Sequence, residues 1–219
     1  MKKIYVFAVC MLFLLVGVAS ATDVLQIGGT YTGGIALLEN GTTPLSEGGG
    51  SVDPSYLNGA PLEYLYCADI FTTVNVPGTY PNTAVNNAGD IYGKPLNNAG
   101  QVAWLLSNYG TAGQGAQAYA LQAAIWHVIF EGTGTTIAID PGNSTAQEVN
   151  LYNSYLAALG SNTGNVSQFD WITPGTLDSN GQLVQYQGLV GAPSVPLPVP
   201  IFLLGSGLIG LVGVRRRFK

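Results

Sequence analysis

The chain has 219 residues, enough for one globular domain of ordinary size with signals at its ends. Hydrophobic residues make up 47% of the chain and charged residues only 9%, far below the usual share of roughly one quarter, which excludes a charge-rich disordered protein. The 30 glycines and 12 prolines follow no collagen-like period, so they indicate a turn-rich domain that contains β-structure.

The charges are unevenly distributed along the chain. Between Thr22 and Pro198 there is one cation, Lys94, against all 12 acidic residues, which gives this part a net formal charge of −11. A segment with one cation cannot neutralise phosphates, so nucleic acid is excluded as a partner. An intracellular metabolic enzyme is also not expected, because this part lacks the Arg and Lys residues that usually bind substrate phosphates or carboxylates.

The first 21 residues have the three parts of a secretory signal peptide. A basic start at Lys2 and Lys3 is followed by an apolar stretch over 4–18 and by Ala19-Ser20-Ala21, a small-residue cleavage pattern. We therefore expect export and a mature chain that begins near residue 22. The alternative is an uncleaved membrane anchor.

Residues 193–219 form a second signal. A proline-rich hinge over 194–200 is followed by an apolar segment over 201–214 and a basic tail over 215–219. Residues 199–214 would reach about 24 Å as a helix, which suits temporary retention in a membrane. The basic tail would stay in the cytoplasm and the body outside.

This tail resembles the PEP-CTERM family of sorting signals, which occur in exported proteins of Gram-negative bacteria and are processed by exosortases. Val195-Pro196-Leu197-Pro198 stands where that family usually carries Pro-Glu-Pro, as in a variant class. The resemblance implies an exosortase-like processing enzyme as a partner, and a cell-surface or extracellular protein that is at least transiently anchored in the inner membrane. A plain C-terminal membrane anchor is the alternative.

The mature chain keeps a single cysteine, Cys67, because Cys10 leaves with the signal peptide. A lone cysteine in an exported protein indicates a dimer bridge, a reactive thiol, a lipid anchor or a thiol already consumed in another bond. Residues 62–71 around it predict a central strand, with Leu65, Cys67 and Asp69 on one face. A buried cysteine that acts as a small hydrophobe fits the same pattern.

Two helices are predicted downstream of this strand, over 100–109 and 116–131, each ended by a glycine. The apolar stripe of the second helix includes Gln122. An amide on a buried face needs hydrogen-bond partners, or it costs about 1–3 kcal/mol. Reaction with a buried cysteine thiol would remove that amide altogether.

At this point the sequence resembles the thioester domain family of bacterial surface proteins. Tyr66-Cys67-Ala68-Asp69 matches the family's strand cysteine, and Leu121-Gln122-Ala123-Ala124-Ile125-Trp126 matches its Thr-Gln-x-Ala-Ile-Trp helix, with leucine in place of threonine. The likeness spans residues 63–131 and extends more loosely to 189. It implies an internal thioester between Cys67 and Gln122 that an amine or hydroxyl of a surface protein or polysaccharide attacks. The protein would be a single-use covalent adhesin or crosslinker, not a turnover enzyme.

Other residues have supporting or structural interpretations. Asp69 or Tyr66 is a candidate for assisting proton transfer, and Trp126 is a further candidate for supporting the site. His127 lies about 500° round the helix from Gln122 and is expected on the helix surface. No cofactor is expected, and one histidine with one cysteine gives no metal site of that type. Residues 140–145 are expected to lead into a helix with a Ser144/Gln147 capping box, calcium binding being the alternative.

The predicted fold class is α+β, a β-rich shell of sandwich or barrel-like form with a helical insertion that carries Gln122. Residues 22–192 form this domain. Further strands are expected near 24–27, 35–38 and 183–190, with a turn at Gly48-Gly49-Gly50.

Three functions remain open from the sequence. The first is the thioester adhesin or matrix crosslinker. The second is a non-covalent structural or carbohydrate-binding component of the extracellular polymer layer, in which some of the 12 tyrosines and 3 tryptophans would bind sugars. The third is a secreted cysteine hydrolase that uses Cys67 and His127.

Overall fold

The computed structural model describes residues 22–29 and 34–193. The predicted signal peptide and the C-terminal signal from residue 194 onward lie outside the described residues. Within the part that is described, no helix is both long and apolar enough to cross a membrane.

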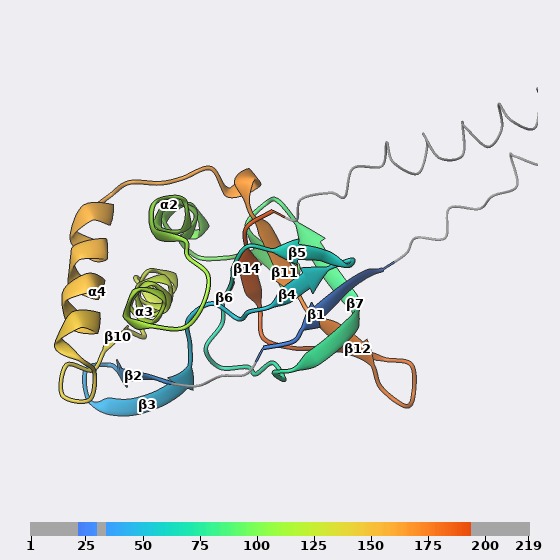
Figure 1. Cartoon of the computed structure of the whole chain (residues 1–219), viewed down its shortest axis with the longest axis horizontal. Helices are drawn as coiled ribbons and strands as arrows, with labels where there is room; N and C mark the ends of the chain where they lie inside the picture. Colours follow the sequence, from blue (N-terminus) through green and yellow to red (C-terminus); the bar gives the residue numbers. More distant parts are fainter. Residues whose placement is uncertain (1–21, 30–33, 194–219) are drawn as a thin grey trace, which may run out of the picture.

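In the described residues the fold is α+β, with a β-rich, barrel-like sheet that is nearly closed and three α-helices on one side of it (Figure 1). Neighbouring strands in this seven-stranded sheet pair antiparallel. The strands follow the order β5 (Ala60–Leu62), β4 (Ser55–Leu57), β1 (Asp23–Ile27), β7 (Gly78–Asn86), β11 (Asp170–Thr173), β14 (Leu189–Gly191) and β6 (Leu65–Cys67).

Residues 22–29 and 34–193 also form three small sheets. They are β10-β2-β3 (Ile137–Ile139, Gly34–Glu39, Thr43–Gly48), β12-β13 (Gly175–Leu177, Leu183–Gln185) and β8-β9 (Asp90–Ile91, Lys94–Pro95). The helices are α2 (Ala99–Tyr109), α3 (Ala116–Phe130) and α4 (Ala146–Leu159), with a short 3-10 turn, η2 (Val166–Gln168).

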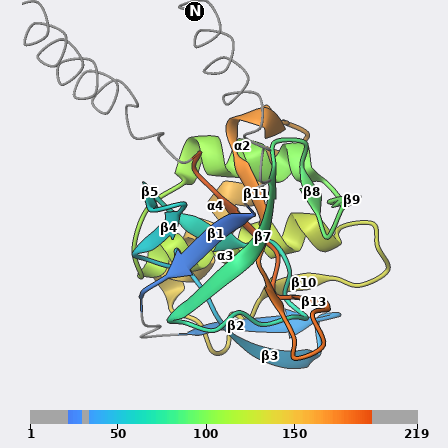
Figure 2. The ribbon, with the colours of Figure 1, turned by 90° about the vertical axis from the view of Figure 1, so that its right-hand side faces the viewer.

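Helix α3 lies at the centre of the helical part and packs against α2, α4 and β10 (Figure 1). Seen from the side of the sheet, β1 and β7 lie in front of this helix (Figure 2). Because α3 is apolar nearly all round, it is buried on most of its surface. Its buried residues are Ala118, Ala120, Leu121, Gln122, Ala123, Ala124, Ile125, Trp126, Val128 and Ile129.

Several predicted elements are confirmed. The expected strands near 24–27 and 35–38 are β1 and β2, and the two helices expected before and around Gln122 are α2 and α3. The helix after residue 145 is also present as α4, but its capping box is formed by Thr145 and Glu148 rather than by Ser144 and Gln147. The predicted box was therefore wrong by one residue, and Ser144 instead donates its N–H to Asp140.

Two predicted strands are wrong in extent. The central strand expected over 62–71 is only three residues long, Leu65–Cys67, and is the last strand in the sheet order. The strand expected over 183–190 is divided between β13 and β14, which belong to different sheets. The division occurs because Tyr186 donates its N–H to Pro174 and Gln187 donates its N–H to Thr73.

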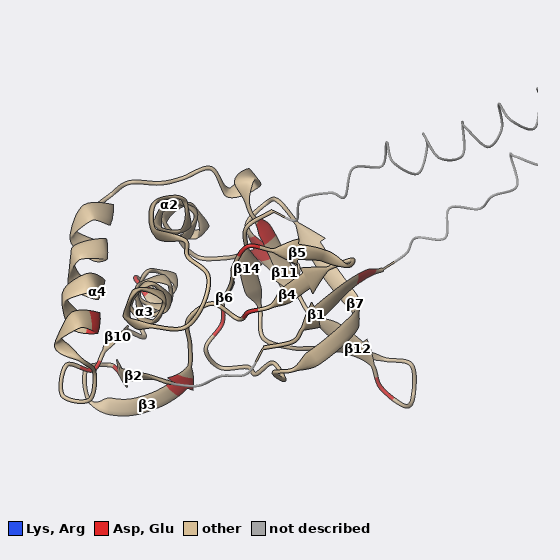
Figure 3. Cartoon of the chain, in the orientation of Figure 1, with Lys and Arg blue, Asp and Glu red and all other residues tan. Residues whose placement is uncertain are grey.

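Acidic residues are spread over the described part of the chain, on strands, helices and loops (Figure 3). Lys94 in β9 is the one lysine or arginine that this part contains.

Candidate functional site

Strand β6 has two differently occupied edges. On one edge it pairs with β14, with Leu65 opposite Gly191 and Cys67 opposite Leu189. On the other edge the segment after β3 begins a second ladder, because Val52 donates its N–H to the Leu65 carbonyl at 2.8 Å. Leu65 in turn donates its N–H to the Ser51 hydroxyl at 3.1 Å.

Gln122 of α3 continues this second ladder at Cys67. The Cys67 N–H donates to Oε1 of Gln122 at 2.8 Å, and Nε2 of Gln122 donates to the Cys67 carbonyl at 2.7 Å. Both residues are 0% exposed. The carboxamide thus satisfies both main-chain groups of Cys67, as a neighbouring strand would, and meets its own need for partners in the interior.

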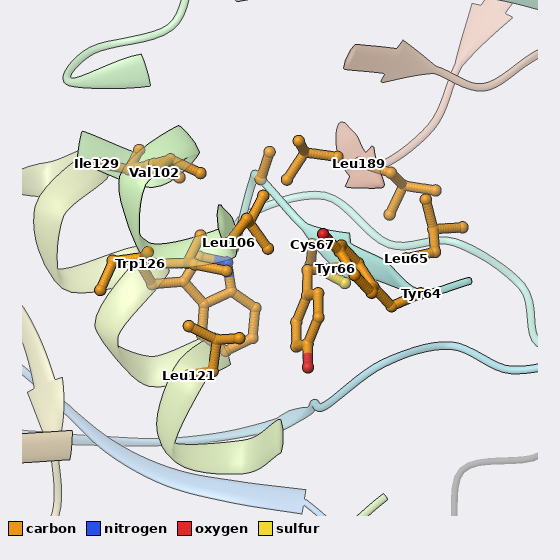
Figure 4. Close-up of a cluster of buried hydrophobic side chains, with 14 of the residues drawn as sticks. Tyr64, Leu65, Tyr66, Cys67, Val102, Leu106, Leu121, Trp126, Ile129 and Leu189 are labelled. Atoms are coloured by element: carbon orange, nitrogen blue, oxygen red, sulfur yellow. The ribbon is translucent and has the colours of Figure 1, made fainter. Parts of the chain in front are cut away.

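The thiol of Cys67 lies in the same interior. Figure 4 shows Cys67 among Tyr66, Leu106 and Leu189, with the α3 side chains Leu121 and Trp126 directed toward the strand. The sulfur is only a few bonds away from the main-chain N–H and carbonyl that hold the Gln122 amide. The fold therefore brings the predicted cysteine and the predicted glutamine to one buried place.

A glycine segment covers Gln122. Gly49 and Gly50 are both buried, and a Cβ placed on Gly49 would lie 3.6 Å from Cγ of Gln122 and overlap Ile35. Gly50 has φ +81, and a Cβ there would lie 3.2 Å from the Tyr119 ring. Glycine is needed here for close approach and for a left-handed backbone. The turn predicted at Gly48-Gly49-Gly50 is thus part of the cover over the amide.

The loop before α3 holds this cover in place. Ser51 donates its N–H to the Gly113 carbonyl at 3.2 Å, and Nε2 of Gln114 donates to the Ser51 carbonyl at 2.8 Å. The Gly113 N–H donates to the Asp53 carboxylate. Sequence reasoning missed Ser51, Val52 and Asp53, and the three consecutive glycines were the one signal that pointed to a close approach.

Asp69 lies beyond the end of β6. Its carboxylate accepts hydrogen bonds from the Phe71 N–H at 2.9 Å, from the Tyr92 hydroxyl at 2.7 Å and from the Thr72 hydroxyl. Burial, together with the Asp69 carboxylate, raises the pKa of Tyr92 to about 12. Asp69 and Ala68 also line a largely apolar cavity of about 300 Å³.

Tyr66 and Trp126 differ in how their polar atoms are used. The Tyr66 hydroxyl donates to the Thr111 carbonyl at 2.7 Å, and burial raises the pKa of Tyr66 well above its ordinary value. Trp126 is 0% exposed, and no described residue accepts a hydrogen bond from its indole Nε1.

His127 is not a surface residue, and that prediction is wrong. It is half-buried, with Nδ1 at 2.9 Å from the Ile137 carbonyl and at 2.8 Å from the Tyr152 hydroxyl. These partners belong to β10 and α4, whereas Gln122 of the same helix contacts β6. The position five residues after Gln122 explains the different direction, because it lies about 140° away around the helix.

The Asp140 loop is an ordinary turn into α4. The Asp140 carboxylate accepts from Nδ2 of Asn143 at 2.7 Å and from the Gly142 N–H at 2.8 Å. These hydrogen bonds, the one from Asn143 first, lower the pKa of Asp140. Across residues 22–29 and 34–193, no three His, Cys, Asp or Glu side chains are grouped so that they could hold a metal ion.

No family model matches the chain, and neither curated proteins nor solved structures include a match to it.

Proposed function

We propose that this protein forms an internal thioester between Cys67 and Gln122 and uses it for covalent adhesion or crosslinking outside the cell. The observation that carries the proposal is the double hydrogen bond between the Gln122 carboxamide and the main chain of Cys67. These two hydrogen bonds hold the buried amide against the main chain of the residue that carries the thiol, and such proximity favours intramolecular acyl transfer.

The first step joins the two side chains. The Cys67 sulfur attacks Cδ of Gln122, and the Cys67 N–H already donates to the oxygen on which negative charge develops. The thiol proton passes to the amide nitrogen, the C–N bond breaks and ammonia leaves. The product is a Cys67–Gln122 thioester, with no co-reactant consumed.

The second step transfers the acyl group to a partner. An amine or hydroxyl attacks Cδ of Gln122, the C–S bond breaks, and the nucleophile's proton goes to the sulfur. Asp69, which lines a cavity together with Ala68, is the candidate that passes this proton from the nucleophile to the sulfur. Each molecule reacts once, so the chain is an acyl-transfer adhesin rather than a turnover enzyme.

The buried surroundings support a thioester that survives until a partner arrives. Gln122 is 0% exposed, and the Gly49–Gly50 segment packs over it. Exclusion of water slows hydrolysis of a reactive acyl group.

The resemblances at the chain ends give the proposed location. We infer an exported domain over 22–192, a helical insertion within its β-rich shell, and a C-terminal segment that holds the chain at least transiently in the inner membrane. The proposed partners are an exosortase-like processing enzyme and a nucleophile-bearing surface protein or polysaccharide. Nucleic acid is not among the proposed partners.

Intact mass of the exported chain tests the proposal. We expect the wild-type protein to be lighter than its sequence by one ammonia and to gain one methylamine on incubation with that amine. Cys67→Ala is expected to show neither change. Gln117→Ala removes an exposed glutamine of the same helix and is the matched control, which should behave as wild type.

An unmodified mass, with Cys67 alkylated in the unfolded protein, would overturn the thioester and favour a non-covalent structural or carbohydrate-binding component. Labelling of Cys67 by a covalent peptidase probe, lost in His127→Ala, would instead favour a hydrolase.

A further inference from the structure

The indole nitrogen of Trp126 is a buried donor that no described residue satisfies. Trp126 is 0% exposed, so its N–H is removed from bulk solvent. Native proteins pair nearly all buried polar groups, and a catalytic role is one recognised reason for an exception. Only one other buried side-chain atom in the described part of the chain, Oε1 of Gln101, shares this condition.

Trp126 and Gln122 belong to the same side of α3. Trp126 follows Gln122 by four residues in α3, a spacing that puts both side chains on the same side of the helix. Helical side chains lean toward the N-terminus, so the indole covers the turn that contains Gln122. Figure 4 shows the indole projecting from α3 toward the strand that carries Cys67.

The Gln122 oxygen has capacity for a second donor. In the resting arrangement, Oε1 accepts the Cys67 N–H at 2.8 Å, and a carbonyl oxygen has two lone pairs. When a nucleophile attacks Cδ, this oxygen becomes an oxyanion and its demand for donors rises. The neighbouring Tyr66 hydroxyl is already committed to the Thr111 carbonyl at 2.7 Å.

We infer that Trp126 Nε1–H and the Cys67 N–H together form an oxyanion hole for the Gln122 carbonyl; this inference rests on the proposed function. The two donors hold the oxygen while the sulfur attacks and ammonia leaves. They hold it again while an amine attacks and the C–S bond breaks. In both steps the oxyanion collapses back to a carbonyl, and Trp126 neither gains nor loses a proton.

The sharpest test replaces Trp126 in the full chain by 3-benzothienylalanine, which keeps the bicyclic shape and has sulfur in place of the N–H. We expect the rate of methylamine uptake, followed by intact mass, to fall roughly 100- to 1,000-fold. The thermal unfolding midpoint should stay equal to wild type or rise, because the resting protein loses no hydrogen bond.

Trp171 is the matched control. It is also 0% exposed, but its Nε1 donates to the Val166 carbonyl at 2.9 Å. The same analogue at Trp171 should lower the unfolding midpoint and leave the rate of methylamine uptake unchanged. Trp126→Phe also lacks the N–H and replaces the analogue as the test variant if the analogue does not fold. It should slow methylamine uptake in the molecules that have formed the thioester.

The outcomes separate the inference from the proposed function. A wild-type chain with the ammonia deficit, together with a Trp126 analogue that reacts at the wild-type rate, overturns the role of the indole and leaves the thioester in place. A wild-type chain without the deficit overturns both.

Discussion

The side-chain amide of Gln122 occupies the hydrogen-bonding edge of Cys67. Oε1 and Nε2 lie 2.8 and 2.7 Å from the main-chain nitrogen and oxygen of the cysteine, although 55 residues separate the two in sequence. A helix side chain thus takes the place of a strand, and this relationship gives Gln122 a structural role that can be measured apart from any chemistry.

The structural role predicts a loss of stability when the amide is removed. In a Cys67→Ala background, where no thioester can form, adding Gln122→Ala should lower the free energy of unfolding by about 2–4 kcal/mol, because two buried main-chain groups lose their partners. Urea unfolding measures the difference. Gln117→Ala in the same background should change the value by less than about 0.5 kcal/mol. A loss below about 1 kcal/mol for Gln122→Ala would mean that water or another residue replaces the amide.

The glycine cover predicts a specific effect on thioester lifetime. Gly50→Ala places a side chain at φ +81, against the Tyr119 ring, and should displace the segment over Gln122. Hydrolysis of the thioester, measured by mass as conversion of Gln122 to glutamate, should then be faster.

Gly59→Ala is the control for that experiment. Gly59 has a similar φ of +78, but a Cβ there would meet no atom within 4 Å. Both variants carry backbone strain of about 1–2 kcal/mol, and only Gly50→Ala should shorten the lifetime. Equal lifetimes in the two variants would show that the segment does not shield the bond.

Tyr92 predicts an alkaline pH dependence. Its hydroxyl donates to Asp69 and accepts the Gly188 N–H at 2.9 Å, so Tyr92→Phe should cost about 1–2 kcal/mol near neutral pH. Burial first, and the Asp69 carboxylate with it, raise the pKa of Tyr92 from 10.0 to about 12. A raised pKa in the folded state gives stability that is complete below pH 10 and is lost as the pH rises toward 12.

Denaturant unfolding of wild type and Tyr92→Phe across this range measures the contribution. The difference between the two proteins should be constant below pH 10 and should narrow as the pH approaches 12. A difference that does not depend on pH would mean that Tyr92 ionises as readily in the folded as in the unfolded chain.

Tyr66 is predicted to be structural. Its hydroxyl is committed to the Thr111 carbonyl, and burial keeps it protonated by raising its pKa. Tyr66→Phe should therefore lower stability by about 1–2 kcal/mol without changing the rate of methylamine uptake. A slower reaction at unchanged stability would instead assign proton transfer to this hydroxyl.

The sequence predicted the helical part of the site well and the β-part poorly. Gln122 and its helix followed from an apolar 3.6-residue pattern with glycine at the ends, which is local information. The strand around Cys67 was predicted too long because the apolar run over 62–71 does not show that the pairing of β6 with β14 covers only Leu65–Cys67. His127 was misplaced because the packing of α4 and β10 against α3 is not encoded near it.

The contact between residues 67 and 122 was proposed from a resemblance and not from periodicity. Nothing in either segment specifies which strand residue a given side chain of the helix will contact. Trp126 was noted only as a supporting residue. Its unsatisfied nitrogen is a property of the folded interior that the sequence does not display.

The edge of β6 that does not pair with β14 is also filled by hydrogen bonds. A terminal strand with open N–H and carbonyl groups is a template on which another polypeptide can add a strand, and proteins block such edges to avoid aggregation. Here Ser51, Val52 and Gln122 together fill that edge. The glutamine therefore also closes the edge at Cys67, the position at which a further strand would otherwise add.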